Sequence, residues 1–161
     1  MGLGFLRFIA YFEGMELSSK ISGDIDVMYA MQNLPRAMQT KALRPALRAG
    51  GELVRKAAIA NVKRVAIKGR STGKLARSII ARNARKKSGQ LRVVVAVAAG
   101  RVYPSGTRVG LVGSVLEFGK KGQAPAPWLR PALRSTANSV YNVVLSVSRQ
   151  NLSKAIEDAR R

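Results

Sequence analysis

Residues 91–98, LRVVVAVA, decide the fold class of this 161-residue chain. The run is dense in β-branched valine, which is typical of strands, and it predicts a central strand of a sheet. Upstream, residues 75–84 predict a short helix followed by a second strand. The charged segment 85–89, RKKSG, lies between the two β-prone runs and predicts a hairpin tip. Downstream, residues 110–118 predict a third strand after the loop 103–106.

Helical patterns flank these strands on both sides. After Pro45, apolar or small residues recur at three- and four-residue steps up to about residue 66. Pro45 marks either the first turn of a new helix or a kink. The pair Gly50-Gly51 either permits close approach of another backbone or weakens the helix. Residues 129–159 predict a long helix with one apolar face, which must pack against the sheet or another helix.

The N-terminal part of the chain predicts shorter elements. Residues 1–14 are apolar and aromatic, and we expect an arm that packs on this protein or on a neighbour. The stretch has neither a basic n-region nor the ~20 apolar residues of a membrane span. Residues 16–25 predict a short strand, and Asp24 offers an N-cap for a short helix that ends near Asn33.

Together these patterns predict the α+β class. The expected order is basic N-terminal helices, a small antiparallel β-sheet, and a long C-terminal helix packed on the sheet. We expect two parts in the chain: the apolar arm over residues 1–14 and a single domain over residues 15–161.

Positive charge is concentrated in the middle of the chain. The net charge is +21, and the segment 36–134 holds 23 Lys and Arg against two acids, Glu52 and Glu117. The two ends together hold six basic and six acidic residues, which cancel. So basic a unit repels itself unless polyanions or acidic partner surfaces lie nearby, which predicts contact with nucleic acid or acidic proteins. The alternative is a solvated basic face with no partner.

The composition argues against catalysis. The chain has no His and no Cys, which removes the commonest general base, the commonest metal ligand and all thiolate chemistry. The segment 69–75, GRSTGKL, is not a phosphate loop, because three residues separate its glycines and Leu follows its Lys. We therefore predict no catalytic residue, no metal ligand and no cofactor, and we do not expect an enzyme.

Basic residues of the predicted loops and turns are the candidate contacts to nucleic acid or to acidic partners. They are Lys68, Arg70, Lys74, Arg85, Lys86, Lys87, Lys120 and Lys121. No aromatic residue falls between Met31 and Arg101, so a platform that stacks bases is not expected there. Any contact with DNA is expected at the phosphate backbone, which makes binding sensitive to salt.

Three motifs in a fixed order resemble a known family. They are Thr72-Gly73-Lys74-Leu75-Ala76-Arg77-Ser78-Ile79, then Val115-Leu116-Glu117-Phe118-Gly119, then residues 124–133, APAPWLRPAL. From roughly residue 17 to the end, the sequence resembles small siphophage tail components and head–tail connectors, also called tail-completion or neck proteins. The resemblance marks ten structural residues: Thr72, Gly73, Leu75, Ser78, Glu117, Phe118, Gly119, Pro127, Trp128 and Pro131.

Structural roles are expected for these residues. Gly73 and Gly119 permit tight turns, and the two prolines fix the start of the last helix. Phe118 and Trp128 are expected to anchor the sheet to that helix. Glu117 is expected to pair with a basic residue, either of this chain or of a neighbouring subunit.

The resemblance implies a structural virion protein of the tail or neck. It implies a ring, a hexamer by the family's symmetry, at the end of the tail that faces the head. The implied partners are further copies of the chain, neighbouring neck, connector and tail-tube proteins, and genomic DNA passing through the channel without sequence readout. No membrane contact is expected, and the host cytoplasm is the expected place of assembly. The alternative is a free, non-sequence-specific nucleic-acid-binding protein.

Overall fold

A computed structural model describes residues 36–65, 73–84 and 91–160, together with four short strands near the N-terminus. These strands are β1 (Arg7–Phe8), β2 (Tyr11–Phe12), β3 (Met15–Glu16) and β4 (Ser19–Lys20). β1 pairs with β4 and β2 with β3, both antiparallel. The strand predicted over residues 16–25 thus appears in part, as β3 and β4. The helix expected after Asp24 lies outside the described residues, and the boundary at residue 14 stays a prediction.

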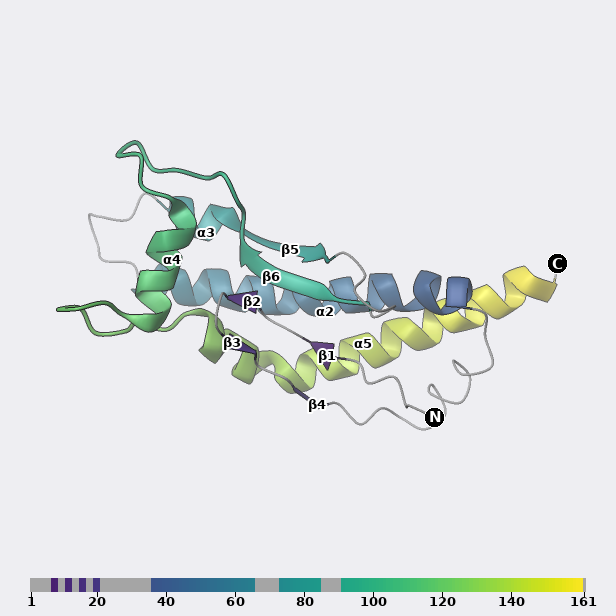
Figure 1. The fold of residues 1–161 in the computed structure, drawn as a ribbon. Coiled ribbons are helices and arrows are strands. Elements are labelled where there is room, and N and C mark those ends of the chain that lie inside the picture. Colours follow the sequence, from purple (N-terminus) through teal and green to yellow (C-terminus); the bar gives the residue numbers. More distant parts are fainter. Residues whose placement is uncertain are drawn as a thin grey trace.

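The remaining elements follow the order helix, short helix, hairpin, helix, long helix (Figure 1). They are α2 (Arg36–Val65), α3 (Lys74–Ser78), β5 (Ile79–Asn83), β6 (Val93–Val97), α4 (Val109–Phe118) and α5 (Leu129–Arg160). The predicted α+β architecture is confirmed: a basic helix, a small antiparallel sheet and a long C-terminal helix that shares one core with the sheet.

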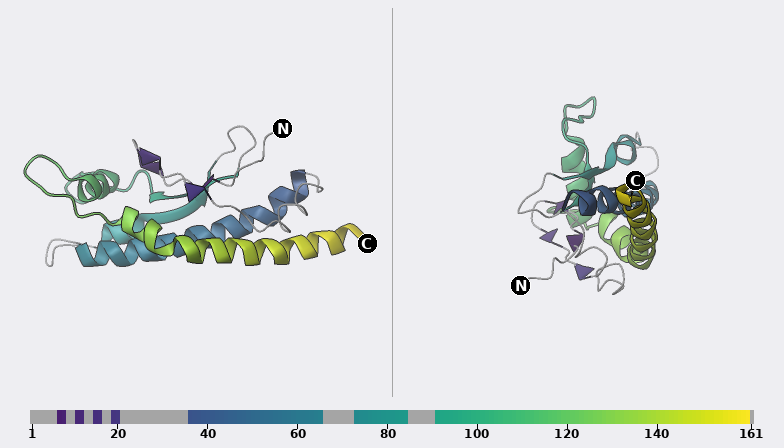
Figure 2. Two further views of the ribbon diagram at one scale, coloured as in Figure 1. Left: turned by 90° about the horizontal axis from the view of Figure 1, so that it is seen from below. Right: turned by 90° about the vertical axis from the view of Figure 1, so that its right-hand side faces the viewer.

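The two long helices lie side by side and run in opposite directions (Figures 1 and 2). Near one end of the pair, Asn61 Nδ2 donates to the carbonyl of Trp128 at 3.0 Å. Near the other end, Asn151 Nδ2 donates to the carbonyl of Ala42 at 3.0 Å. Thirty residues of α-helix span about 45 Å, so this pair sets the long dimension of the described fold.

α2 is continuous through Pro45, so the predicted new helix start at this proline is wrong. A proline inside a helix typically costs about 3 kcal/mol, because it removes a hydrogen bond and crowds the preceding turn. The Pro45 ring is exposed, while the flanking residues Ala42, Ala46 and Leu47 are buried. Packing of this buried side against the rest of the fold therefore keeps the helix intact.

The glycine pair in α2 permits close approach, as one of the two interpretations predicted. A Cβ at Gly50 would lie 3.0 Å from side-chain carbons of both Val140 and Val144 on α5. A Cβ at Gly51 would lie 2.6 Å from Cγ1 of Val93 on β6. The two adjacent glycines thus bring α5 and the hairpin against neighbouring positions of one helix.

The short helix and hairpin predicted around residues 75–98 are confirmed. β5 pairs with β6 in antiparallel register from Ile79↔Val97 to Asn83↔Val93. The tip over residues 85–89 lies outside the described residues. β6 was expected to be a central strand, but within the described chain it pairs with β5 alone. Its valines are explained by packing, because Val93 and Val95 point into the core.

The third predicted strand is wrong, since residues 109–118 form the helix α4. Nearly every position of this run is apolar or small, so no period separates helix from strand in the sequence. The tertiary structure decides instead. Val109, Gly113 and Glu117, at helical four-residue steps, form the buried side of α4.

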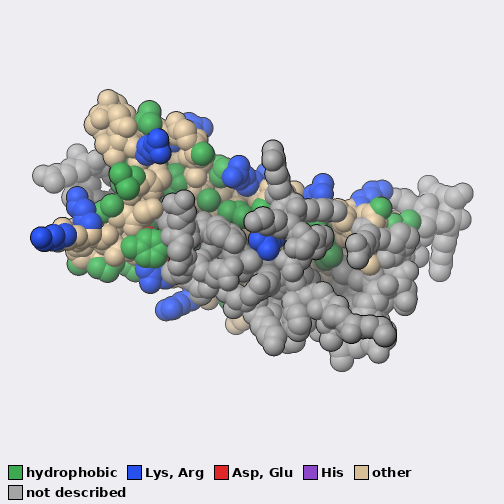
Figure 3. Space-filling view, viewed as in Figure 1, with side chains coloured by type: hydrophobic (Ala, Val, Ile, Leu, Met, Phe, Trp, Pro, Cys, Tyr) green, Lys and Arg blue, Asp and Glu red, His purple; other side chains and the backbone are tan. Residues whose placement is uncertain are grey.

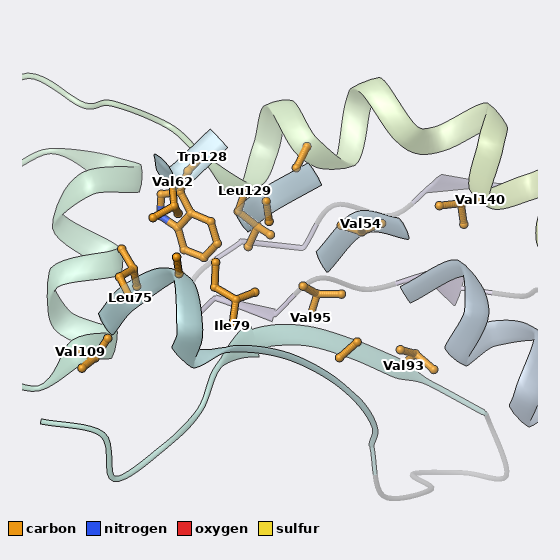
Figure 4. Packing of buried hydrophobic residues seen from close by; sticks show 14 of the residues in the cluster. Val54, Val62, Leu75, Ile79, Val93, Val95, Val109, Trp128, Leu129 and Val140 are labelled. Atoms are coloured by element: carbon orange, nitrogen blue, oxygen red, sulfur yellow. The ribbon is translucent and has the colours of Figure 1, made fainter. Parts of the chain in front are cut away.

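One hydrophobic core joins all these elements (Figure 4). Its fully or nearly buried members come from α2, α3, both strands of the hairpin, α4 and α5. They include Val54, Val62, Leu75, Ile79, Val93, Val95, Val109, Trp128, Leu129 and Val140. A smaller cluster of Ala42 and Leu152, with Leu145 beside it, continues the contact of α2 with α5 beyond the hairpin.

Gly51→Ala tests the close packing of β6 on α2. Alanine favours the helix by about 1 kcal/mol, but its Cβ would clash with Val93. Overpacking of this kind costs about 1–3 kcal/mol. We expect net destabilisation in urea unfolding, and the double variant Gly51→Ala/Val93→Ala should lose less than the two single losses added together. Strict additivity would contradict this account of the glycine.

Candidate functional site

The carboxylate of Glu117, at the end of α4, caps the start of α5. Its side chain is fully buried. Oε2 accepts hydrogen bonds from the backbone N–H groups of Trp128 and Leu129, each at 2.8 Å. Oε1 accepts from the backbone N–H of Arg130 at 3.0 Å. The negative charge therefore lies at the positive end of the α5 dipole, where an anion is stabilised.

This arrangement satisfies all the free donors at the start of α5. The first N–H groups of a helix have no partner within the helix. Trp128, Leu129 and Arg130 donate to Glu117, and the next residue, Pro131, has no N–H to satisfy. Pro131 therefore lies in the first turn of α5, where a proline is well tolerated. This agrees with the prediction that Pro131 helps to fix the start of the last helix.

Arg130 closes the same junction from the α5 side. Its Nε donates to Glu117 Oε1 at 3.1 Å, and its Nη2 donates to the backbone carbonyl of Glu117 at 3.1 Å. A cation at the C-terminus of α4 is favoured by the dipole of that helix. The ion pair expected for Glu117 is therefore found within this chain, with Arg130 as its partner.

Trp128 connects three helices at this point. It is fully buried, its Nε1 donates to the carbonyl of Gly113 on α4 at 3.0 Å, and its carbonyl accepts from Asn61 of α2. Gly113 faces the indole, and a Cβ there would lie at an ordinary contact distance of 3.5 Å from Cζ2. Trp128 thus anchors α5 to α4 and α2, whereas the sequence predicted an anchor between the sheet and this helix.

Phe118 does not share that role. Its side chain is 40% exposed, and the guanidinium of Arg130 lies over its ring, 5.0 Å from the centroid. The anchor prediction is wrong for this residue, because the buried side of α4 is already occupied by Gly113 and Glu117. The exposed aromatic ring instead belongs to the outer surface of the junction.

Two of the predicted turn glycines have the conformation that glycine favours. Gly73 precedes α3 with φ of 68°, and Gly119 follows α4 with φ of 78°. At Gly119 a Cβ would also lie 2.8 Å from the carbonyl oxygen of Gln123. Pro127 lies exposed in the loop that leads to α5.

The first family motif forms α3 and its start. Leu75 and Ser78 are buried, and Ser78 Oγ donates to the carbonyl of Lys74 at 2.7 Å. Thr72 lies outside the described residues. The motif residues that are described therefore act in packing and turn formation and present no reactive group to solvent.

The predicted basic contacts are only partly described. Lys74 starts α3, while Lys120 and Lys121 are exposed in the loop after α4. Figure 1 shows α3 and this loop toward opposite ends of α4, so the structure does not bring the three lysines together. Lys68, Arg70, Arg85, Lys86 and Lys87 lie outside the described residues.

Two surfaces were not singled out from the sequence. A hollow beside α3 is lined by Lys74, Arg77, Ser78, Arg101 and Pro104. The solvent-exposed part of α2 carries Lys and Arg at six positions: Lys41, Arg44, Arg48, Lys56, Lys63 and Arg64. The signal for this second surface was present in the sequence as seven-residue spacings, 41 to 48 and 56 to 63.

The described surface has very little negative charge. Of the two acids in residues 36–134, Glu117 is buried and Glu52 is bonded to Arg55 at 2.6 Å. The described part of the face in Figure 3 shows Lys and Arg but no Asp or Glu, and hydrophobic side chains gather over the end that holds α4. No group of three or more potential metal ligands occurs among the described residues. None of the described helices is long and apolar enough to span a membrane.

The chain belongs to the HK97-gp10-like family, whose model, described as "Bacteriophage HK97-gp10, putative tail-component", matches residues 26–119. The match covers more than half of the chain and ends at Gly119, before the third motif on which the resemblance also rested. No curated protein and no solved structure gives a match.

Membership of this family makes the chain a structural protein of a bacteriophage tail. It therefore belongs in the virion, among other tail and neck proteins. A structural role is consistent with our expectation that the protein is not an enzyme.

Glu117→Gln tests the capped junction. An amide has a single acceptor oxygen, and its NH2 group would face N–H donors, so we expect a loss of roughly 3 kcal/mol in the free energy of unfolding. Glu52→Gln is the matched control. It breaks only a partly exposed ion pair, which should cost less than about 0.5 kcal/mol. Similar losses for the two variants in urea unfolding would refute a special role for Glu117.

Proposed function

We propose that this protein is a tail-completion or head–tail joining component of a tailed phage. Copies of the chain form a ring, a hexamer by the family resemblance, at the end of the tail that faces the head. The ring surrounds the channel through which the genome passes, and it contacts connector and tail-tube proteins. The copies gather in the host cytoplasm during assembly.

An exposed apolar face on α4 is the observation that carries this proposal. Leu111 is 60% exposed and Phe118 is 40% exposed. Val115 lies between them at helical spacing and is half-buried, so the three share one side of the helix. An apolar surface of this kind, rimmed by polar groups, is typical of contacts between proteins.

The junction of α4 with α5 supports the same role. Glu117, Arg130 and Trp128 hold the C-terminal end of α4 against the start of α5 through buried hydrogen bonds. A surface that joins two assemblies under load needs a rigid base, because ordering a mobile surface on binding costs free energy. The exposed face of α4 has such a base.

The charge fits a protein that surrounds DNA. Subunits with a net charge of +21 repel one another unless anions lie nearby. In a ring around the genome, phosphates and acidic surfaces of neighbouring proteins supply those anions. A free nucleic-acid-binding protein is the alternative, and the exposed cations of α2 are the observation that favours it.

Disruption of the gene alone, followed by electron microscopy of the lysate, tests the proposal. We expect DNA-filled heads and separate tails that fail to join, with virions restored when the wild-type protein is supplied from a plasmid. Normal infectious particles without the protein would refute the joining role and favour the alternative.

Complementation by variants then tests the α4 face. Leu111→Ser should fold with an unchanged melting temperature, because the side chain is largely exposed, yet it should restore at least tenfold fewer virions than wild type. Val102→Ser is the control, since Val102 is 46% exposed but lies in the loop before α4. Equal rescue by both variants would remove α4 from the proposed contact.

A further inference from the structure

Five of the six exposed cations of α2 lie on one side of the helix, and only Arg64 lies outside it. With 3.6 residues per turn, Lys41, Arg44, Arg48, Lys56 and Lys63 fall within an arc of about 120°. From the first to the last they cover about 33 Å along the helix axis at 1.5 Å per residue. We call these five residues the α2 basic face.

Both other sides of α2 are occupied, which leaves this one open. α5 packs at Gly50, and the hairpin packs at Gly51. Figure 2 shows, along the length of the molecule, that α5 and the hairpin lie on different sides of α2. All five cations of the α2 basic face are exposed in the folded chain.

The chemistry of this face favours phosphate over protein. Its other exposed positions, Ala37 and Pro45, carry small side chains, and the half-buried Glu52 on this side is paired with Arg55. The centre of a protein–protein interface is typically apolar or aromatic and depleted of charged residues, and no large apolar side chain is exposed here. Duplex DNA, by contrast, presents one phosphate charge per ~1.7 Å of axis, so a line of cations alone is sufficient for binding.

The partner helix shows that the pattern is not a general property of the surface. The described part of α5 carries three exposed cations, Arg134, Arg149 and Lys154, against six on α2, and most of its other exposed positions are uncharged, as at Asn138, Asn142 and Ser146. Two helices of similar length, packed on each other, thus present different chemistry to solvent. Cations are concentrated on α2.

We propose that the α2 basic face binds the phosphate backbone of duplex DNA without reading its sequence. Its length of about 33 Å corresponds to roughly ten base pairs at 3.4 Å each. The proposal rests on the proposed function for the source of the DNA, which is the genome in the channel. It moves the expected DNA contact from the loops and turns around residues 68–74, 85–87 and 120–121 to a rigid helix.

Fluorescence anisotropy of a labelled 30-base-pair duplex of random sequence tests this, with the full chain titrated at several KCl concentrations. The test variant is Arg48→Gln/Lys56→Gln. The control, Arg134→Gln/Lys154→Gln, also removes one exposed Arg and one exposed Lys, but from α5. The substituted side chains are exposed, and circular dichroism checks that both variants keep the wild-type melting temperature.

Loss of two phosphate contacts should reduce the slope of log K against log salt by about 1.8. At 0.15 M salt this corresponds to roughly 30-fold weaker binding, whereas the control should stay within about threefold of wild type. Equal losses in both variants, or no loss in the α2 variant, would overturn the proposal. The proposal would also be overturned if the α2 variant lost binding to poly-glutamate but kept its affinity for duplex DNA. That result would indicate an acidic protein as the partner of the α2 basic face.

The outcome is separable from that of the gene disruption. Virions that assemble normally without the protein, together with duplex binding through α2, would refute the joining role and leave the α2 basic face standing. If heads and tails failed to join but duplex binding did not depend on Arg48 and Lys56, the joining role would be supported and DNA binding by the α2 basic face would be refuted.

Discussion

The buried carboxylate of Glu117 is the constraint on which the rest of the structure depends. A fully buried charge without partners is strongly unfavourable, and here it is matched by three backbone N–H groups and by Arg130. These bonds exist only when α5 starts directly beside the end of α4. Trp128 is placed in the core by the same geometry, and through Asn61 it sets the start of α5 on α2.

From that point α2 and α5 determine the rest of the architecture. Gly50 and Gly51 bring α5 and the hairpin against one helix, so α2 has a packed side and an open side. The packed side is built from small residues and valines, and the open side carries cations. In the proposed ring, α4, whose C-terminal end is held against α5 by buried hydrogen bonds, contacts neighbouring proteins. α2 provides a rigid surface for DNA.

Much of this fold was predictable from local patterns. The valines around Val95 indicated a strand, and the steps along residues 129–159 indicated the long helix. α4 was not predictable in this way, because nearly all of its ten residues are apolar or small, so the sequence shows neither a helical nor a strand period. The sequence predicted that Glu117 pairs with a basic residue, but it did not show that this residue is Arg130. Its role as a cap depends on the chain folding back over the loop 119–127.

The surfaces were harder to predict than the core. Phe118 belongs to a family motif, yet its exposure follows from which side of α4 faces Trp128, and that is a tertiary property. The cations of α2 were visible in the sequence, but their significance depends on which side of the helix is covered. Helical periodicity alone does not show that α5 and the hairpin leave this side free.

Electron cryomicroscopy of the assembled virion tests the central claim most directly. The account predicts a ring of this protein at the head-facing end of the tail, with α2 lining the channel and the cations at Lys41, Arg48 and Lys63 directed at the DNA. The exposed side of α4 should contact a neighbouring protein. Absence of the protein from the virion, or a ring in which α2 faces away from the channel, would contradict the account.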